Sequence, residues 1–128
     1  MIVASNLSKR YPGGYEALKD ISFEISAGQM VFITGHSGAG KSTLVKLIAS
    51  IERPTAGSLV VNGQNLSALR RSAIPYVRRH LGMVFQDPDH QIFSTDVVGE
   101  IAFGPEQLGW PSSRIDRAVT GILHPFRL

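Results

Sequence analysis

Hydrophobic and polar positions in two N-terminal stretches predict two β-strands. Residues 2–7 form the first stretch, and the alternation of Ile21, Phe23 and Ile25 marks the second. Such alternation places every second side chain on the same face of a sheet. Residues 11–14 lie between the stretches and contain one proline and two glycines, which favour a turn. This part of the chain therefore predicts two strands separated by a turn.

A short apolar run at residues 31–34 predicts a third strand, of the kind found buried in parallel sheets. A glycine-rich stretch separates this run from the next apolar group. The apolar residues of that group recur at helical spacing. They are Leu44, Val45, Leu47, Ile48 and Ile51. The order along the chain is therefore strand, glycine-rich loop and helix.

The following segments predict another strand, a helix and a further strand. Residues 59–61 are β-rich and end in Asn62-Gly63, a strong signal for a tight turn. From Leu66 onward the pattern is helical, and Pro75 fits only the first turn of a helix. Residues 81–85 form another short apolar strand.

The last third of the chain predicts two helices. Thr95 or Asp96 caps the first, and Gly104-Pro105 stops it. Ser112 or Ser113 caps the second. One face of that second helix is apolar and carries Ile115, Ala118, Val119 and Ile122.

The glycine-rich loop carries the clearest chemical signal, because residues 35–43 satisfy the G-x-x-x-x-G-K-[ST] pattern of a phosphate-binding loop. Glycines allow the backbone to curl around phosphates, so that N–H groups and the next helix N-terminus face the anion. Lys41 adds a positive charge, Ser42 offers a hydroxyl to Mg²⁺, and Thr43 is a further phosphate donor. The candidate phosphate-binding residues are Gly35, Ser37, Gly38, Ala39, Gly40, Lys41, Ser42 and Thr43.

A chance glycine-rich turn is the alternative interpretation of this loop. The strand predicted before it and the helix predicted after it disfavour that alternative, because a phosphate loop requires this order. The sequence therefore predicts binding of a nucleoside triphosphate.

Composition and charge narrow the function further. The 128 residues are 43% hydrophobic, enough for one core, and contain no cysteine for disulfides or thiolate metal sites. No apolar run reaches the length of a membrane span, and the N-terminus does not resemble a signal peptide, so we expect a cytoplasmic protein. A net charge of +3 is too small to indicate nucleic-acid binding.

A basic cluster stands out within this modest overall charge. It fits a solvated helical face better than a surface for phosphates or an acidic partner, although both alternatives stay open. The cluster comprises Arg70, Arg71, Arg78, Arg79 and His80.

Together with the phosphate loop, three other features resemble the ATP-binding subunit of an ABC transporter: Tyr11, the turn at residues 52–57 and the segment at residues 81–87. Residues 1–87 are similar to the cell-division branch of these ATPases, and residues 85–109 to the cobalt and energy-coupling-factor importer branch. The resemblance implies an α/β P-loop NTPase fold, namely the N-terminal part of an ABC ATPase domain. Residues 1–87 would form the β-subdomain with the P-loop, the Q-loop and the start of the core sheet, and residues 88–128 the start of the helical region.

The resemblance also implies roles for two residues outside the loop. Tyr11 would stack its ring on adenine, whereas without the loop it would be read as an ordinary turn aromatic. Gln86 occupies the Q-loop position, where the family's glutamine contacts Mg²⁺ or the attacking water and reports to the membrane subunit. ATP and Mg²⁺, the latter at Ser42 and Gln86, are therefore the implied ligands.

The sequence departs from the family after Gln86. It contains no Leu-Ser-Gly-Gly signature, no Walker B strand ending in Asp-Glu and no switch histidine. Asp87 is a weaker candidate for a metal carboxylate because its segment fits the Q-loop better, and His124 reads as a residue of the chain end. The chain is therefore predicted to be truncated relative to a complete domain.

Two functions stay open on this basis. The first is an ATP-hydrolysing subunit that works with a membrane-spanning ABC subunit, as a homodimer or heterodimer at the inner face of the cell membrane. The second is a nucleotide-binding module without ATPase activity of its own. A small P-loop kinase is a third and weaker alternative, in which the arginines at positions 70, 71, 78 and 79 would serve as an arginine-rich lid.

Overall fold

A computed structural model describes residues 1–84, 86, 92 and 94–127 of the chain. The chain divides into two compact units, Met1–Met83 and Val84–Leu128. The first unit contains the sheet and the phosphate loop, and the second contains a pair of helices. Among the described residues, no helix combines the length and the apolar character that crossing a membrane requires.

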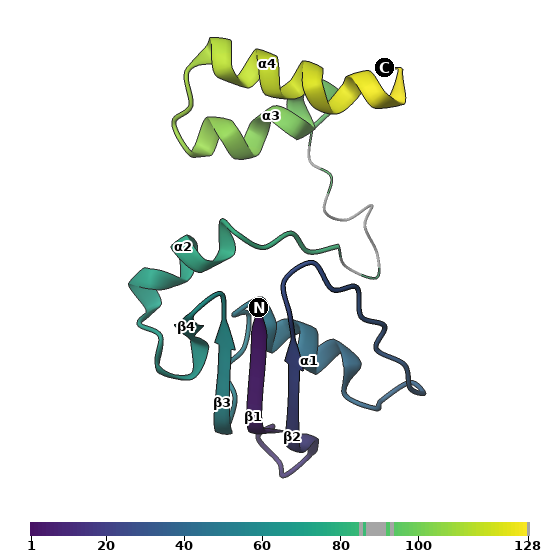
Figure 1. Ribbon diagram of the computed structural model, residues 1–128, viewed down its shortest axis with the longest axis vertical. Helices are drawn as coiled ribbons and strands as arrows, with labels where there is room; N and C mark the ends of the chain where they lie inside the picture. The colour runs from purple at the N-terminus through teal and green to yellow at the C-terminus, as the bar shows by residue number, and fades with distance from the viewer. Residues whose placement is uncertain (85, 87–91, 93, 128) are drawn as a thin grey trace. The chain divides into compact units, whose positions relative to one another are not determined.

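The sheet of the first unit has four antiparallel strands in the order β2-β1-β3-β4, three of which stand side by side in Figure 1. The strands are β1 (Ile2–Arg10), β2 (Glu16–Ile25), β3 (Ala56–Val61) and β4 (Gln64–Asn65). The strands predicted at residues 2–7, 21–25 and 59–61 are thus confirmed. The predicted tight turn joins β3 to β4, with φ angles of 49° at Asn62 and 80° at Gly63 that suit a two-residue hairpin.

Around Asn6, strand β1 contains one extra residue relative to its neighbours β2 and β3. Ala4 pairs with Phe23 and Leu7 with Ile21, so three steps on β1 face two on β2. Asn6 sits in this bulge with a φ of 49°. The bulge explains why Ala4 and Leu7 are both buried although strict alternation would put them on opposite faces.

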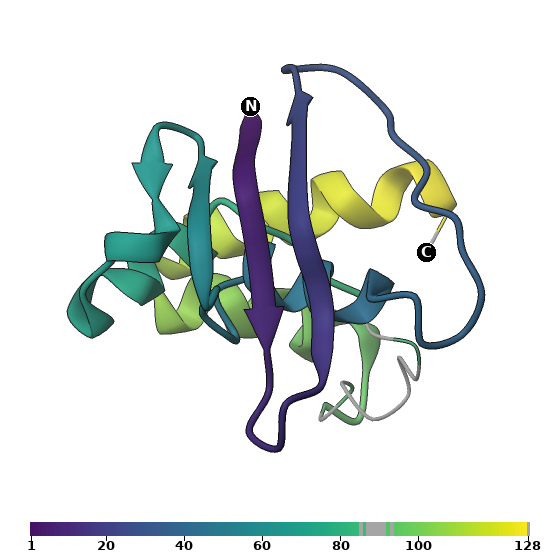
Figure 2. The ribbon, with the colours of Figure 1, turned by 90° about the horizontal axis from the view of Figure 1, so that it is seen from below.

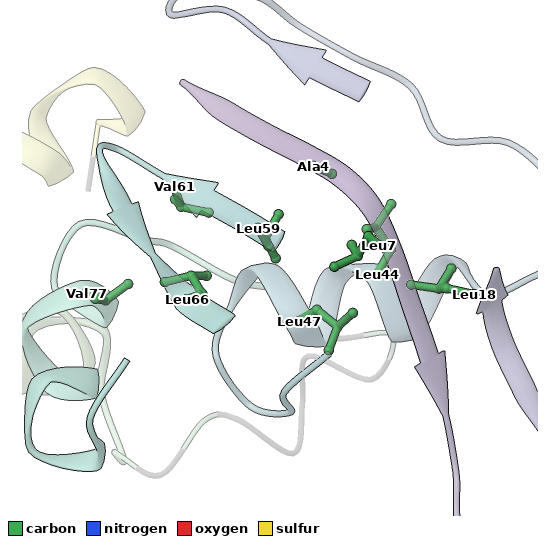
Figure 3. Close-up of a cluster of buried hydrophobic side chains, with 9 residues drawn as sticks. All are labelled: Ala4, Leu7, Leu18, Leu44, Leu47, Leu59, Val61, Leu66 and Val77. Atoms are coloured by element: carbon green, nitrogen blue, oxygen red, sulfur yellow. The ribbon is translucent and has the colours of Figure 1, made fainter. Parts of the chain in front are cut away.

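Helix α1 (Lys41–Ile48) supplies Leu44 and Leu47 to the core of this unit. Figure 3 shows these side chains among those of the strands. Burying such aliphatic side chains contributes about 1.5 to 3 kcal/mol each, so the helix and the sheet stabilise one another. The buried cluster comprises Ala4, Leu7, Leu18, Leu44, Leu47, Leu59, Val61, Leu66 and Val77.

Three short helical segments follow β4. Single 3₁₀ turns span Leu66–Ala68 and Arg71–Ala73, and α2 spans Ile74–Arg78. Pro75 lies in the first turn of α2, as predicted. The five residues of the basic cluster are all exposed. Arg78 donates hydrogen bonds to the carbonyls of Ala49 and Ser50, which satisfies acceptors left at the end of α1.

The strand predicted at residues 31–34 is wrong. Residues 29–36 form no regular structure, and Figure 2 shows the connection between β2 and α1 as a wide loop. A strand is maintained by hydrogen bonds to a neighbour, and the described sheet contains no partner for this run. Residues 81–84 of the other short predicted strand are also irregular, and Phe85 lies outside the described residues.

The second unit is a helical hairpin of α3 (Val97–Gln107) and α4 (Ser112–Leu123), followed by a 3₁₀ turn at His124–Phe126. Ala102, Ile115 and Val119 form its buried centre. Asp96 caps α3 as predicted, because its carboxylate accepts a hydrogen bond from Gly99 N at 2.6 Å.

Two boundaries in the second unit differ from the prediction. Helix α3 continues through Gly104-Pro105 to Gln107, although Pro105 has no N–H to donate, and the Pro105 carbonyl accepts a bond from Trp110 N. Helix α4 begins at Ser112 after Pro111, and neither serine caps it through a side-chain hydrogen bond. Pro111 has extended backbone geometry, which defines the start of the helix without such a cap.

Candidate functional site

The phosphate loop is exposed from Gly35 to Ala39 and leads directly into α1. It curls tightly, because a β-carbon added at Gly35 would lie 3.1 Å from that of Ala39. Gly40 precedes the helix with a φ of 94°, and a β-carbon there would lie 2.4 Å from the carbonyl oxygen of Ala17. Only glycine fits this position without a shift of the neighbouring strand.

Lys41 folds back over the loop. Its ammonium donates hydrogen bonds to the carbonyl oxygens of Gly35 and His36, the latter at 2.9 Å. Ser42 is exposed in the first turn of α1, and that turn contains no acidic residue. The positive end of the helix and the cation therefore lie beside the loop, an arrangement that favours anions.

Tyr11 and Tyr15 flank the turn between β1 and β2. Tyr11 N donates to the Tyr15 carbonyl at 2.8 Å, and the two rings are nearly parallel, with 6.4 Å between their centroids. The Tyr15 hydroxyl donates to the carbonyl of Gly38 at 3.1 Å, and the Lys9 ammonium lies 5.2 Å from the centre of the Tyr11 ring. These contacts attach the aromatic turn to the phosphate loop.

The Tyr11 hydroxyl connects β1, α1 and the turn after α1. It donates to Glu52 Oε2 at 2.5 Å, and its oxygen lies 3.2 Å from Thr43 Oγ1. Because a phenol has a single proton, the Thr43 hydroxyl must be the donor in the second contact. The bond to the Glu52 carboxylate raises the pKa of Tyr11, and the bond from Thr43 acts in the opposite direction.

The structure brings most of the predicted site residues together in the first unit. Tyr11 joins the phosphate loop through Thr43, and Thr43 itself is buried. Gln86 is exposed and belongs to the second unit. Asp87 lies outside the described residues, and His124 is exposed at the end of α4.

Sequence reasoning missed two residues at this site. Tyr15 and Tyr11 are tyrosines on the two sides of one predicted turn. Aromatic residues facing each other across a hairpin often interact, and this pattern could have identified Tyr15. Glu52 lies 41 residues from Tyr11, and no local pattern predicts their contact. No group of three His, Cys, Asp or Glu side chains suited to a metal ion gathers within the part of the chain that the structure describes.

Comparison with known proteins agrees with this architecture. A protein-family profile described as "ABC transporter" matches residues 18–125. The chain is 42% identical over 123 residues to the cell division ATP-binding protein FtsE of Escherichia coli strain K12, covering 96% of this chain and 55% of FtsE. It is 41% identical over 109 residues to the energy-coupling factor transporter ATP-binding protein EcfA of Methanosphaera stadtmanae, covering 85% and 39%.

Solved structures of ABC transporter ATPases also resemble the chain. CbiO1 of Clostridium perfringens, part of the ABC transporter complex CbiONQ, superposes with a TM-score of 0.87 at 32% identity, covering 96% of this chain and 49% of that one. The dimeric bacterial ABC transporter cassette MJ0796 matches with a TM-score of 0.76 at 28% identity, covering 93% and 54%.

The chain spans about half the length of the curated relatives named here, 55% of FtsE and 39% of EcfA. The matched residues include the whole of α1 and the helical hairpin. The α/β P-loop fold expected from the sequence is confirmed, although its described sheet contains only the antiparallel strands. The chain therefore belongs to the ABC transporter family and carries an N-terminal part of its ATP-binding fold.

Proposed function

We propose that the chain binds Mg-ATP at residues 35–43 as part of an ATP-binding subunit of an ABC system. The observation that carries this proposal is the junction of loop and helix. There the Lys41 ammonium lies against the Gly35 and His36 carbonyls, beside an α1 N-terminus without acidic residues. An incoming phosphate offers this ammonium a stronger, charge-assisted partner than two neutral carbonyls.

The residues present fit such a ligand. Phosphate oxygens would accept bonds from the exposed N–H groups of the loop and from the unpaired N–H groups in the first turn of α1. Thr43 would contribute its main-chain N–H, since its hydroxyl proton is directed at Tyr11. The exposed Ser42 hydroxyl would be a ligand of Mg²⁺, which accepts few protein ligands beside phosphate oxygens. The Tyr11 ring would stack on the adenine.

The relatives support a wider proposal about partners. FtsE is named as a cell division protein and EcfA as part of an energy-coupling factor transporter. MJ0796 is a dimeric transporter cassette. By analogy, we propose that this chain works with a membrane-spanning subunit, peripheral to the inner face of the membrane, and that two copies or two related chains pair around the nucleotide.

The test is calorimetric titration with ATP, with and without Mg²⁺, while phosphate release is assayed in the same samples. Lys41→Ala should lower ATP affinity about a hundredfold, equivalent to roughly 3 kcal/mol, because it removes the charge that meets the phosphates. Lys46→Ala is the matched control, as it removes the same charge from the last turn of the same helix. The ATP affinity of Lys46→Ala should equal that of the wild type.

Each outcome has a distinct meaning. Binding without phosphate release would support a nucleotide-binding module, and release that Lys41→Ala abolishes would support an ATPase. Equal ATP affinity of Lys41→Ala and the wild type would contradict the proposal, provided that circular dichroism shows both to be folded.

A further inference from the structure

We infer that Glu52 is a positioning residue for nucleotide binding, which holds the Tyr11 ring in a fixed orientation relative to the phosphate loop through a hydrogen bond to its hydroxyl. The inference rests on the proposed binding of ATP at that loop. The inference adds Glu52, which lies outside the phosphate loop, to the proposed nucleotide site.

The first support is the strength of the contact. The Tyr11 hydroxyl donates to Glu52 Oε2 at 2.5 Å, a length typical of a phenol or hydroxyl bonded to a charged carboxylate. Both residues are half-buried, so water competes less for the bond than at an open surface. The raised pKa of Tyr11 agrees with a phenol that keeps its proton to donate.

The second support is that Glu52 is itself held in place. Its turn is attached to α1, because Ile51 N donates to the Lys46 carbonyl at 2.9 Å. The same turn is attached to the end of β1, where Lys9 Nζ donates to the Arg53 carbonyl at 2.8 Å. Arg10 N also donates to Thr55 Oγ1 at 2.9 Å. A carboxylate fixed from both sides can define the direction of the ring that it binds.

The third support is the link from the ring to the phosphate side. The Thr43 hydroxyl, one residue beyond Ser42 in α1, donates to the Tyr11 oxygen. Across the turn, the Tyr15 hydroxyl donates to the Gly38 carbonyl at 3.1 Å. The proposed base platform and the phosphate loop therefore belong to one hydrogen-bonded network.

Such a network matters for affinity because a free tyrosine ring loses rotational freedom when a base stacks on it. If the ring is already oriented, less of the stacking energy is lost on binding. Glu52 would therefore strengthen the binding of a ligand that carries a base, and leave unchanged the binding of a ligand with phosphates alone.

The test compares Mg²⁺-ATP with Mg²⁺-tripolyphosphate, which has the phosphates and no base. Tyr11→Phe keeps the ring and removes the hydroxyl, and Glu52→Ala removes its acceptor. Each should lower ATP affinity about fivefold, and the double variant should lose no more than either single one. Glu52→Gln keeps an acceptor oxygen and should restore most of the affinity. Tripolyphosphate affinity should equal that of the wild type in all four variants.

Glu24→Ala is the matched control, since Glu24 is an exposed carboxylate on β2 opposite Val3. The Glu24→Ala variant should bind ATP and tripolyphosphate with the affinities of the wild type. Additive losses in the double variant, or equal losses for ATP and tripolyphosphate, would overturn the inference in favour of a purely structural bond. If Glu52→Ala does not fold, the ATP affinity of Tyr11→Phe tests the inference instead. An ATP affinity of Tyr11→Phe equal to that of the wild type would also overturn the inference. A wild type that binds neither ligand would instead overturn the proposed function.

Discussion

At the scale of single residues, the hydroxyl of Tyr11 accounts for much of the local order around the phosphate loop. One oxygen atom contacts a carboxylate from the turn after α1 and a hydroxyl from within α1. Lys9 and Tyr15 lie against the ring of the same residue. A side chain with this many defined partners has few alternative rotamers, which suits it to receive a planar ligand.

The same environment predicts a pH dependence. The bond to Glu52 raises the pKa of Tyr11 above its ordinary value, so folding favours the protonated phenol. This contribution to stability is fully present below about pH 10, the pKa of tyrosine in an unfolded chain, and is lost as the pH rises through the folded pKa. Glu52→Gln removes the charge and should lower the pKa of Tyr11.

The measurement is a titration of phenolate absorbance. Subtracting the curve of Tyr11→Phe from that of the parent isolates Tyr11 from the other two tyrosines. The same subtraction is made for Glu52→Gln, and Lys9, Thr43 and Tyr15 are unchanged in both pairs. Identical midpoints with and without the Glu52 carboxylate would refute the assigned cause.

At the scale of elements, the approach of β1 to β3 depends on a glycine. Gly57 has a φ of 81°, and a β-carbon there would lie 2.1 Å from the carbonyl oxygen of Asn6, the residue in the β1 bulge. Gly63 has a φ of 80°, and a β-carbon there would meet nothing within 4 Å. The two glycines therefore share a backbone conformation and differ in the space around them.

Alanine at these two positions should separate strain from steric overlap. Gly63→Ala should lower the free energy of unfolding by about 1 kcal/mol, the cost of a left-handed conformation. Gly57→Ala should lower it by roughly 2 to 4 kcal/mol, because β1 and β3 must also move apart. Urea denaturation of both variants measures the difference. Equal losses would show that the strands adjust without cost.

The elements also show how far the sequence could predict the structure. Alternation identified β2, runs of β-forming residues identified β1 and β3, and helical spacing identified α1, because local sequence decides these elements. Residues 31–34 have the composition of a strand, but a strand also requires a neighbour, and composition does not report one. The loop motif predicted the phosphate side of the proposed site, whereas the bond from Tyr11 to Glu52 is a product of folding across 41 residues.

At the scale of the whole molecule, the chain exposes a run of four consecutive apolar residues. Met30 and Phe32 are each 83% exposed, and Val31 and Ile33 are 45% and 44% exposed. Relatives that the chain matches are about twice as long. A contiguous apolar run at the surface favours association with another chain or with further copies.

We therefore expect the purified chain to associate as its concentration rises. Phe32→Ser should reduce this association, because it interrupts the apolar run at its most exposed ring. Phe126→Ser is the matched control, since Phe126 is 70% exposed but stands in the second unit. Sedimentation velocity over a range of concentrations measures the effect. A monomeric wild type, or an equal effect of both substitutions, would contradict this prediction.

The network around Tyr11 also has a consequence for the order of events during synthesis. Its members lie at positions 11, 15, 38, 43 and 52, so every group of the network belongs to the first 52 residues. The ribosome releases a chain from its N-terminus, and domains tend to fold as units in that order. Once β3 has emerged to pair with β1, the nascent chain holds all the residues of this network while the helical hairpin is still being translated. ATP bound as proposed at residues 35–43 would then act as a folding ligand for the growing chain.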